Sequence, residues 1–233
     1  MDPASFSKNW NIILASGSPR RKMLMEHAGF KFEVRIKEND ESFPASLKAG
    51  EIPEFLSQKK SLHFKDDLKK NDLLITADTI VWLRDHVLNK PLDRDEAIAM
   101  LQELSGNVHE VYSAVTLTTI RMQETIVVKS KVYFRSLSNE DIRNYVDTCL
   151  PYDKAGSYGA QEFISSGMNV CSMEEKKFAK QINNEVLMQD CFPSGNREIK
   201  MSGVEKINGS YFNVMGFPIA EVWEKMKKIK NII

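Results

Sequence analysis

The sequence has no excess of charge of either sign, because its 233 residues contain 32 Lys and Arg against 32 Asp and Glu. General nucleic-acid binders carry a basic excess, so this balance argues against nucleic acid as a partner and requires any anion site to be local. No uncharged apolar run approaches the roughly 18 residues of a membrane span, and the first ten residues contain no apolar leader segment. We therefore expect a cytoplasmic protein with no membrane partner.

Cysteine is scarce and a glycine-rich phosphate loop is missing. The three cysteines, Cys149, Cys171 and Cys191, are odd in number and have no CxxC spacing, which favours thiols in a reducing compartment over a disulfide framework. The pattern GxxxxGK[ST] occurs nowhere in the chain, which excludes the P-loop class of nucleotide hydrolases. With 42% hydrophobic and 27% charged residues, the composition is that of a globular protein.

Short apolar runs alternate with amphipathic stretches along the chain. The run LLITADTIVWL at 73–83 is nearly continuous, as expected of a strand that is covered on both faces. Later runs alternate polar and apolar residues and predict two long paired strands. The pattern predicts an α/β fold with strands at 11–15, 30–36, 73–83, 87–90, 109–120, 124–135 and around 210–215, and helices at 19–28, 53–68, 94–104, 140–148 and 218–230.

One segment differs in composition from the rest of the chain. Residues 168–203 are polar, charged and weakly periodic, with a PSGN turn signal at 193–196. Polar segments of this length fold outside the core of a domain as a rule. We expect a single domain over 1–233 with this segment as an inserted surface excursion.

The stretch LASGSPRRK predicts a local anion site. A strand that ends in Ser16-Gly17-Ser18 is followed by a helix that opens with Pro19, so free backbone N–H groups lie at the helix start. Arg20 and Arg21 are unfavourable next to the positive end of the helix dipole unless an anion binds there. The alternative is that both arginines are solvated surface cations.

Asp78 is the second unusual position, because it lies inside the apolar run at 73–83. Burying an isolated carboxylate costs several kcal/mol, so Asp78 must be paired, bind a metal or face a cleft. Alternatively, it bonds to neighbouring backbone at a strand end. A carboxylate base, a second acid such as Glu41, a metal ion and cations such as Lys90 together can cleave a phosphoanhydride.

The loop LPYDKAGSYGAQ at 150–161 places polar side chains among small residues that allow a ligand close to the backbone. It contains Asp153, Lys154 and Gln161, and an amide such as that of Gln161 can read the edge of a base through paired donor and acceptor bonds. An ordinary surface loop is the alternative.

Taken in order, several stretches resemble the motif series of the Maf family of nucleoside triphosphate pyrophosphatases, over about residues 11–165 and 204–228. The resemblance implies a mixed central sheet with flanking helices and two lobes around a cleft, related to the inosine triphosphatase type. It also implies hydrolysis of a nucleoside triphosphate to the monophosphate and pyrophosphate, with Mg²⁺ or Mn²⁺ as cofactor. The stretches are LASGSPRR, KENDES, SQKKS, TADTIVW with NKP, LSGNVHEVYSAV, YDKAGSYGAQ and INGSYFNVMGFP.

The same resemblance assigns roles to individual residues. Asp78 is similar to the family's general base and Glu41 to its metal-associated acid, so both are expected near the metal. The catalytic set is completed by Lys60 and Lys90. The substrate-binding set is Ser16, Arg20, Arg21, Thr79, Lys154 and Gln161.

The motifs resemble the pyrimidine branch of the family, which acts on dTTP and UTP and by extension on CTP or modified pyrimidine nucleotides. The chain departs from the family at Cys149-Leu150, where Gly-Glu is usual, and at Glu162, where glycine is usual. Two alternatives stay open: a catalytically weakened nucleotide-binding regulatory protein of the same fold, and a 7-methyl-GTP pyrophosphatase. A homodimer is compatible with the sequence.

Overall fold

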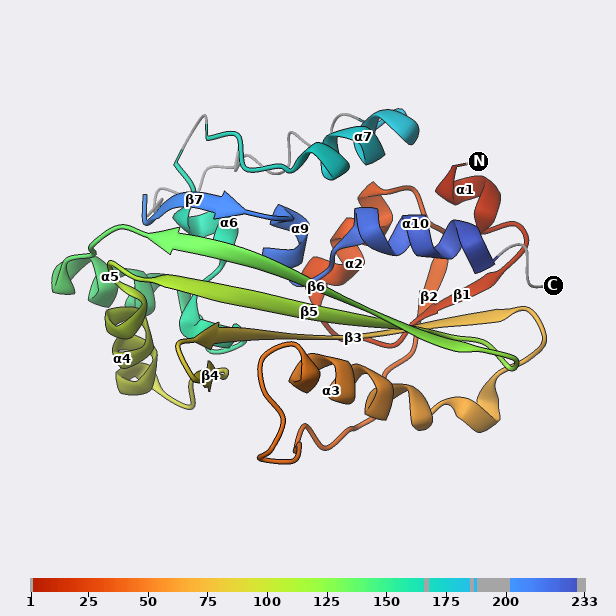
Figure 1. Cartoon of the computed structure of the whole chain (residues 1–233), viewed down its shortest axis with the longest axis horizontal. Helices are drawn as coiled ribbons and strands as arrows, with labels where there is room; N and C mark the ends of the chain where they lie inside the picture. Colours follow the sequence, from red (N-terminus) through yellow and green to blue (C-terminus); the bar gives the residue numbers. More distant parts are fainter. Residues whose placement is uncertain (1, 166–167, 185–186, 188–201, 230–233) are drawn as a thin grey trace.

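The centre of the molecule is a mixed seven-stranded sheet in a computed structural model that describes residues 2–165, 168–184, 187 and 202–229 (Figure 1). The strand order is β2-β1-β3-β5-β6-β7, with β4 also paired to β3. β1 is parallel to β2 and β3, and all other pairs are antiparallel. The strands are β1 (Asn11–Leu14), β2 (Phe32–Val34), β3 (Asp72–Leu83), β4 (His86–Leu88), β5 (Val108–Thr118), β6 (Gln123–Phe134) and β7 (Val204–Asn208).

Helices cover both faces of this sheet, which confirms the expected α/β class. One face carries α1 (Pro3–Phe6), α2 (Pro19–His27), α9 (Tyr211–Val214) and α10 (Ile219–Ile229), and the other carries α3 (Glu51–Leu62) (Figure 1). The remaining helices are α4 (Arg94–Leu104), α5 (Asn139–Cys149), α6 (Ala160–Phe163) and α7 (Met173–Gln181).

The larger core lies between the sheet and α10. Trp223 of α10 is fully buried and packs edge-on against Phe6 and Phe30, with ring centroids 5.7 and 5.6 Å apart. A smaller cluster on the opposite face joins Ile52 and Leu56 of α3 to Ile80 of β3. Burial of large side chains on both sides fixes the sheet between two layers of helix.

β3 presents alternate residues to these two layers, as a strand must. Ala77 and Val81 belong to the larger core, whereas Ile80 packs against α3 and Thr76 donates a hydrogen bond to the Ser57 carbonyl of α3 (2.7 Å). Asp78 lies two residues before Ile80, so its side chain is on the same face of the strand and points toward α3.

One edge of β3 is interrupted in its middle. β1 pairs with β3 only as far as Leu14 opposite Ile75, and β4 pairs with it only from Leu88 opposite Val81. Residues 76–80 consequently have no strand partner on this edge, although β5 pairs with them on the other. The interruption places Asp78 and its neighbours beside open space.

Three predicted elements need correction in extent. The strand predicted at 30–36 is reduced to β2, and the helix predicted at 53–68 runs over Glu51–Leu62, followed by a separate 3₁₀ turn at Lys65–Asp67. The chain leaves the α3 axis because Phe64 turns inward and is buried against Ile13 and Leu74. The return strand predicted at 87–90 is β4.

The strand predicted around 210–215 is wrong, because these residues form α9 and the strand is β7 before it. The Ser210 hydroxyl caps α9 by accepting a hydrogen bond from the Asn213 N–H (3.0 Å). Tyr211 and Phe212 are both fully buried although they are adjacent. A strand covered on one face only would bury one of the two, whereas a helical turn buries both.

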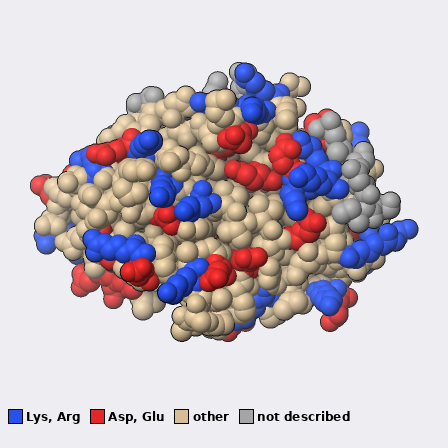
Figure 2. Space-filling model, in the orientation of Figure 1, with Lys and Arg blue, Asp and Glu red and all other residues tan. Residues whose placement is uncertain are grey.

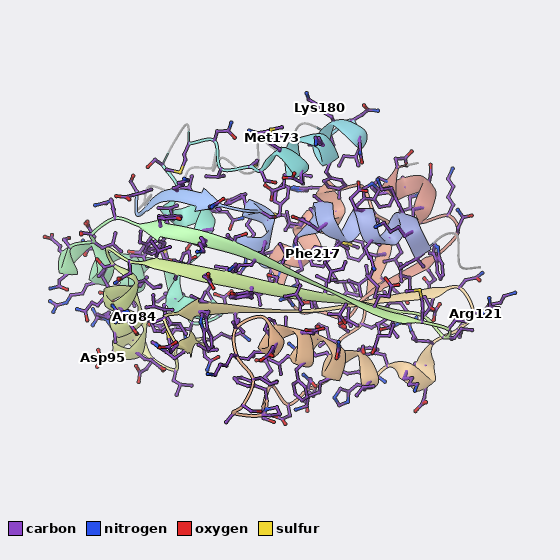
Figure 3. The ribbon with its side chains drawn as sticks, in the orientation of Figure 1. Arg84, Asp95, Arg121, Met173, Lys180 and Phe217 are labelled. Atoms are coloured by element: carbon purple, nitrogen blue, oxygen red, sulfur yellow. The ribbon has the colours of Figure 1, made fainter. Side chains whose placement is uncertain are left out.

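The segment expected to fold outside the core contains α7, and for its described residues that expectation is wrong. Phe178 and Ala179 are buried in α7, while Met173 and Lys180 lie on its outer side (Figure 3). Glu175 is fully buried and accepts hydrogen bonds from the Ser210 hydroxyl and the Phe212 N–H, both at 2.7 Å. The polar composition was misleading because this acid serves as an internal acceptor.

The PSGN turn and Cys191 lie outside the described residues. Over the described part of the chain, no helix combines the length and apolarity needed to cross a membrane. Acidic and basic side chains are interspersed over the face shown in Figure 2.

The packing of α7 predicts that substitutions on its buried face cost much more stability than substitutions on its exposed face. Phe178→Ala should lower the free energy of unfolding by about 3–5 kcal/mol, because it empties a buried aromatic site. The control Met173→Ala, at a residue that is 67% exposed, should change it by no more than about 0.5 kcal/mol. Denaturant titration of the two variants checks this, and equal stabilities would show that α7 does not belong to the core.

Candidate functional site

A cleft of about 690 Å³ opens at the interrupted edge of β3. Its walls come from the β1–α2 loop, α3, the β3–β4 hairpin, the loop before α6 and the turn after α9. Every residue expected at the site except Gln161 lines it, namely Ser16, Arg20, Arg21, Glu41, Lys60, Asp78, Thr79, Lys90 and Lys154. Segments far apart in the sequence thus converge on one cavity.

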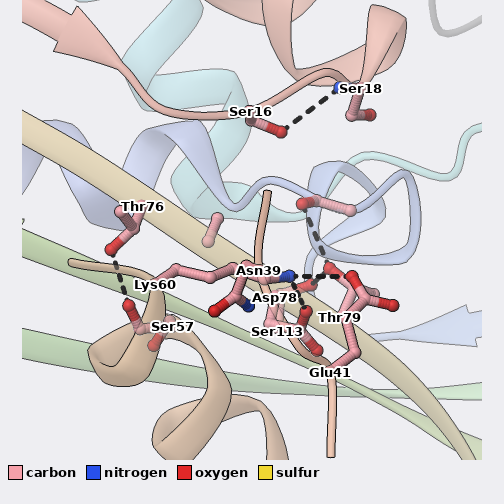
Figure 4. Close-up of polar contacts among 12 residues, drawn as sticks. Ser16, Ser18, Asn39, Glu41, Ser57, Lys60, Thr76, Asp78, Thr79 and Ser113 are labelled. Atoms are coloured by element: carbon pink, nitrogen blue, oxygen red, sulfur yellow. Dashed lines mark hydrogen bonds and ion pairs between the residues drawn. The ribbon is translucent and has the colours of Figure 1, made fainter. Parts of the chain in front are cut away.

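Asp78 is a buried carboxylate held by a single strong ion pair (Figure 4). The Lys60 ammonium donates to Asp78 Oδ1 at 2.5 Å and to Glu41 Oε1 at 3.1 Å. Lys90 reaches the other oxygen of Glu41 at 3.4 Å. Two carboxylates therefore share a bridging lysine at the floor of the cleft.

These contacts alter the acidity of Glu41. Burial raises the pKa of its carboxyl, but the ammonium groups of Lys60 and Lys90 outweigh burial and hold the pKa below its usual value. Glu41 is consequently ionised at neutral pH and available to a cation.

Arg20 and Lys154 both line the cleft and share the carboxylate of Asp153. Arg20 Nη1 lies 3.3 Å from Asp153 Oδ2, and Lys154 Nζ lies 2.8 Å from Asp153 Oδ1. Burial raises the pKa of Asp153, and the two cations lower it by more, so the carboxylate is charged. An incoming polyanion can displace this half-exposed carboxylate and take both cations.

The start of α2 offers backbone donors to the same space. Ser18 is its N-cap residue but makes no side-chain capping bond, and Pro19 occupies the first turn. The Ser18 N–H instead donates to the Ser16 hydroxyl (3.3 Å; Figure 4). The first-turn N–H groups and the positive end of the helix dipole suit a bound anion.

Arg21, in contrast, is already engaged by the protein. Its guanidinium donates to the Gly216 and Ala77 carbonyls at 3.0 and 2.9 Å, and to the Ser16 and Thr79 hydroxyls at 3.1 and 3.2 Å. Burial lowers the pKa of Arg21, and the Asp78 carboxylate opposes part of that shift. Arg21 remains charged because an arginine pKa starts far above neutrality.

The loop at 150–161, which is expected to contact the nucleobase, packs on the β3–β4 hairpin. The Gly156 N–H donates to the Asn89 carbonyl (3.1 Å), and Gly156 has φ +69° with Val81 only 3.0 Å from where a Cβ would lie, so only glycine fits. The loop brings Tyr158, Gly159 and Ala160 to the cleft. Gln161 is partly buried in α6 and does not contribute to the lining.

Sequence reasoning missed several polar residues at this site. Asn39 and His63 line the cleft and are joined by a hydrogen bond of 2.9 Å. Tyr158 is held from behind by His109, whose Nε2 lies 2.7 Å from the Tyr158 hydroxyl. Asn39, Tyr158 and His109 stand inside the quoted motifs, but neither charge nor periodicity marked them for a chemical role.

A divalent cation fits this site only together with its substrate. Among residues 2–165, 168–184, 187 and 202–229, no group of three or more His, Cys, Asp or Glu side chains is arranged to hold a metal ion. Glu41 and Asp78 do face a common point, which the Lys60 ammonium now occupies. Mg²⁺ commonly takes one or two protein carboxylates and completes its shell with phosphate oxygens and water, so two carboxylates suffice.

The fold and the cleft define an α/β protein that can hold a polyanion beside a buried carboxylate. The sequence profile described as "Maf-like protein" matches residues 11–179. The chain belongs to this Maf-like family.

Relatives in the family are similar over nearly their whole length. The chain is 40% identical over 221 residues to the dTTP/UTP pyrophosphatase of Bacteroides thetaiotaomicron, covering 94% of this chain and 96% of that protein. It is 39% identical over 216 residues to the dTTP/UTP pyrophosphatase of Flavobacterium psychrophilum, covering 93% of each.

A solved structure of the nucleoside-triphosphatase, or dITP/XTP pyrophosphatase, of Mycobacterium abscessus is a more distant match. It is 13% identical, with a TM-score of 0.33, and the match covers 53% of this chain and 72% of that one. This likeness is too remote to decide a relation between the two folds, so the inosine triphosphatase type stays a prediction.

The buried His109 predicts a pH dependence of stability. Burial lowers the pKa of His109 to about 3, whereas an unfolded histidine has a pKa of about 6.5. The unfolded state therefore binds more protons below pH 6.5, and the native state loses up to about 1.4 kcal/mol per pH unit as the pH falls.

Substitution isolates this effect from that of other titrating groups. Between pH 6.5 and 5, wild type should lose about 1.6 kcal/mol relative to His109→Gln, which cannot titrate. Parallel pH profiles of wild type and His109→Gln in denaturant titrations would contradict a neutral buried imidazole.

Proposed function

We propose that this chain, as a single domain, hydrolyses dTTP and UTP, and also CTP or modified pyrimidine nucleotides, to the monophosphate and pyrophosphate. The observation that carries the proposal is the Asp78 carboxylate, buried on the interrupted edge of β3 and facing a cleft lined with cations. The names of relatives that are about 40% identical support the same activity and the pyrimidine preference.

Asp78 is proposed as the general base. Lys60 occupies Oδ1, so Oδ2 remains to accept a proton from water. The oxygen of that water forms a bond to phosphorus while the bridging phosphoanhydride bond breaks. The proton passes to Asp78, and pyrophosphate leaves with the bond electrons.

Glu41 and Asp78 would hold the divalent cation, Mg²⁺ or Mn²⁺. A bound cation of this kind neutralises charge on the phosphate oxygens and orients the triphosphate. Lys60 and Lys90 already neutralise Glu41 from two sides, so they are placed to exchange a carboxylate for a phosphate oxygen when substrate enters.

The triphosphate would lie along the first turn of α2. Ser16 and the backbone N–H groups of that turn donate hydrogen bonds, and Arg20 and Lys154 close over the chain of phosphates after leaving Asp153. Thr79 lines the cleft beside them, but its hydroxyl is engaged by Arg21, Ser113 and Gly216. Its role as a substrate ligand remains a prediction.

The nucleobase of the substrate would lie against the loop that contains Tyr158 and Gly159. Gln161 follows the lining residue Ala160, and its amide could reach a uracil or thymine imide after a small movement of this loop. The balanced charge favours a small-molecule substrate over nucleic acid. A cytoplasmic location and a homodimer stay predictions.

Removing the proposed base gives the sharpest test of this function. Asp78→Asn keeps the shape of the side chain but accepts no proton, so turnover should fall by about two to four orders of magnitude. Triphosphate binding should persist, because a negative charge has left the cleft.

The control for this variant lies in the same strand. Asp72 is also buried but bonds the Asn11 amide and the Lys69 N–H at the start of β3, away from the cleft. Asp72→Asn should keep turnover within about threefold while losing about 1 kcal/mol of stability. Near-parental turnover in Asp78→Asn would remove Asp78 from the mechanism, and binding without turnover in the parent would favour a regulatory protein.

Substrate choice is decided by kcat/KM for UTP, dTTP, CTP and 7-methyl-GTP measured side by side. We expect kcat/KM to be highest for UTP and dTTP, because the neutral imide edge of uracil or thymine pairs with an amide. A cationic methylated purine instead favours an aromatic face near an acid. Gln161→Ala should reduce discrimination among bases more than it reduces affinity for the triphosphate. A clear preference for 7-methyl-GTP would reverse the assignment to the pyrimidine branch.

A further inference from the structure

The interruption of β3 leaves backbone groups that need partners. Along the edge that faces β1, the Ile75 carbonyl accepts a hydrogen bond from the Ala15 N–H at 2.9 Å, which is the last bond made by that side of the sheet. The next carbonyl on the same edge belongs to Ala77, immediately before Asp78. A buried carbonyl without a donor is costly, and no strand reaches this one.

Arg21 supplies the missing donor. Its Nη1 donates to the Ala77 carbonyl at 2.9 Å and its Nη2 to the Thr79 hydroxyl at 3.2 Å, so it bonds to β3 on both sides of Asp78. Its Nε donates to the Gly216 carbonyl at 3.0 Å. Gly216 has φ +104°, a conformation that favours glycine, and its carbonyl accepts from Thr79 as well.

The two neighbouring arginines are therefore in different situations. Arg21 uses all three of its nitrogens on four acceptors from three segments of the chain. Arg20 has one ion pair, to a half-exposed carboxylate at the cleft mouth. A guanidinium has five N–H groups, so Arg21 has little capacity left for phosphate, whereas Arg20 is available once Asp153 is displaced.

We propose that Arg21 is a positioning residue that replaces the missing strand partner of β3 and fixes the backbone presenting Asp78, while Arg20 and Lys154 hold the triphosphate. The assignment rests on the proposed function for its catalytic consequence. It departs from the resemblance, which places both arginines on the substrate. Loss of Arg21 should disturb the carboxylate that reacts and leave the phosphate site largely intact.

Lysine substitutions separate the two roles. A phosphate ligand is partly replaceable by lysine, which binds phosphate as a point charge. The acceptors around Arg21 need donors at three separate nitrogen positions, which a single ammonium cannot supply. Lysine should therefore rescue position 20 and fail at position 21.

The experiment compares Arg20→Ala, Arg20→Lys, Arg21→Ala and Arg21→Lys. Calorimetric titration with inorganic tripolyphosphate gives Kd without turnover, and steady-state hydrolysis of UTP gives kcat and KM. Arg20→Ala should weaken tripolyphosphate binding by about tenfold or more, with partial recovery in Arg20→Lys. Both Arg21 variants should keep Kd within about threefold while kcat falls by about a hundredfold or more.

The opposite pattern would overturn the proposal. Loss of tripolyphosphate affinity in Arg21→Ala that Arg21→Lys restores would make Arg21 a phosphate ligand, and unchanged kcat and Kd would give it no role. If the Arg21 variants do not fold, Thr79→Val removes one of the Arg21 acceptors at nearly constant volume and should lower kcat at constant Kd. If wild type hydrolyses no triphosphate, the proposed function fails, and the tripolyphosphate Kd values still decide whether Arg21 is a phosphate ligand.

Discussion

The gap in hydrogen bonding along one edge of β3 is the constraint on which the rest of the site depends. β1 and β4 both pair with this edge but leave residues 76–80 between them without a strand. A continuous strand there would place backbone where the cleft is. Because β5 pairs with the opposite edge from Leu74 to Trp82, β3 has a continuous partner across the gap, and Asp78 is presented from a strand rather than from a loop.

Charge balance inside the cleft follows from the same geometry. Lys60 and Lys90 are paired with Glu41, Lys60 also with Asp78, and Arg20 and Lys154 with Asp153. Without these carboxylates the cations would repel one another in a partly buried space. A triphosphate competes with Glu41 and Asp153 for the same ammonium and guanidinium groups, so affinity reflects an exchange of partners and should weaken as salt screens it.

The sequence predicted most of the fold and most of the charged residues that line the cleft, because each signal was local. Apolar periodicity marked β3, a buried acid in an apolar run marked Asp78, and an unfavourable cation at a helix start marked Arg20. The wrong predictions concern elements whose structure depends on contacts between distant segments. The aromatic residues of α9 suit a strand or a helix, and only the Ser210 cap decides for the helix. The polar composition of α7 predicts a surface position, but Glu175 is buried because Ser210 and Phe212 donate hydrogen bonds to it.

The role of Arg21 also could not be predicted from the sequence. Sequence patterns mark a charged residue but cannot tell whether its donors face a ligand or the backbone of β3, because that depends on a strand that ends early. His109 escaped notice for a similar reason, since only the fold places it behind Tyr158. Residues that hold the site together are less visible in sequence than those that line it.

The cleft is expected to cleave a triphosphate between its first and second phosphates. The most direct measurement is chromatographic identification of the products formed from UTP with Mg²⁺ or Mn²⁺. Cleavage between these two phosphates gives UMP and pyrophosphate in equal amounts, with no UDP. Formation of UDP and inorganic phosphate, or the absence of any product with UTP and dTTP, would contradict it.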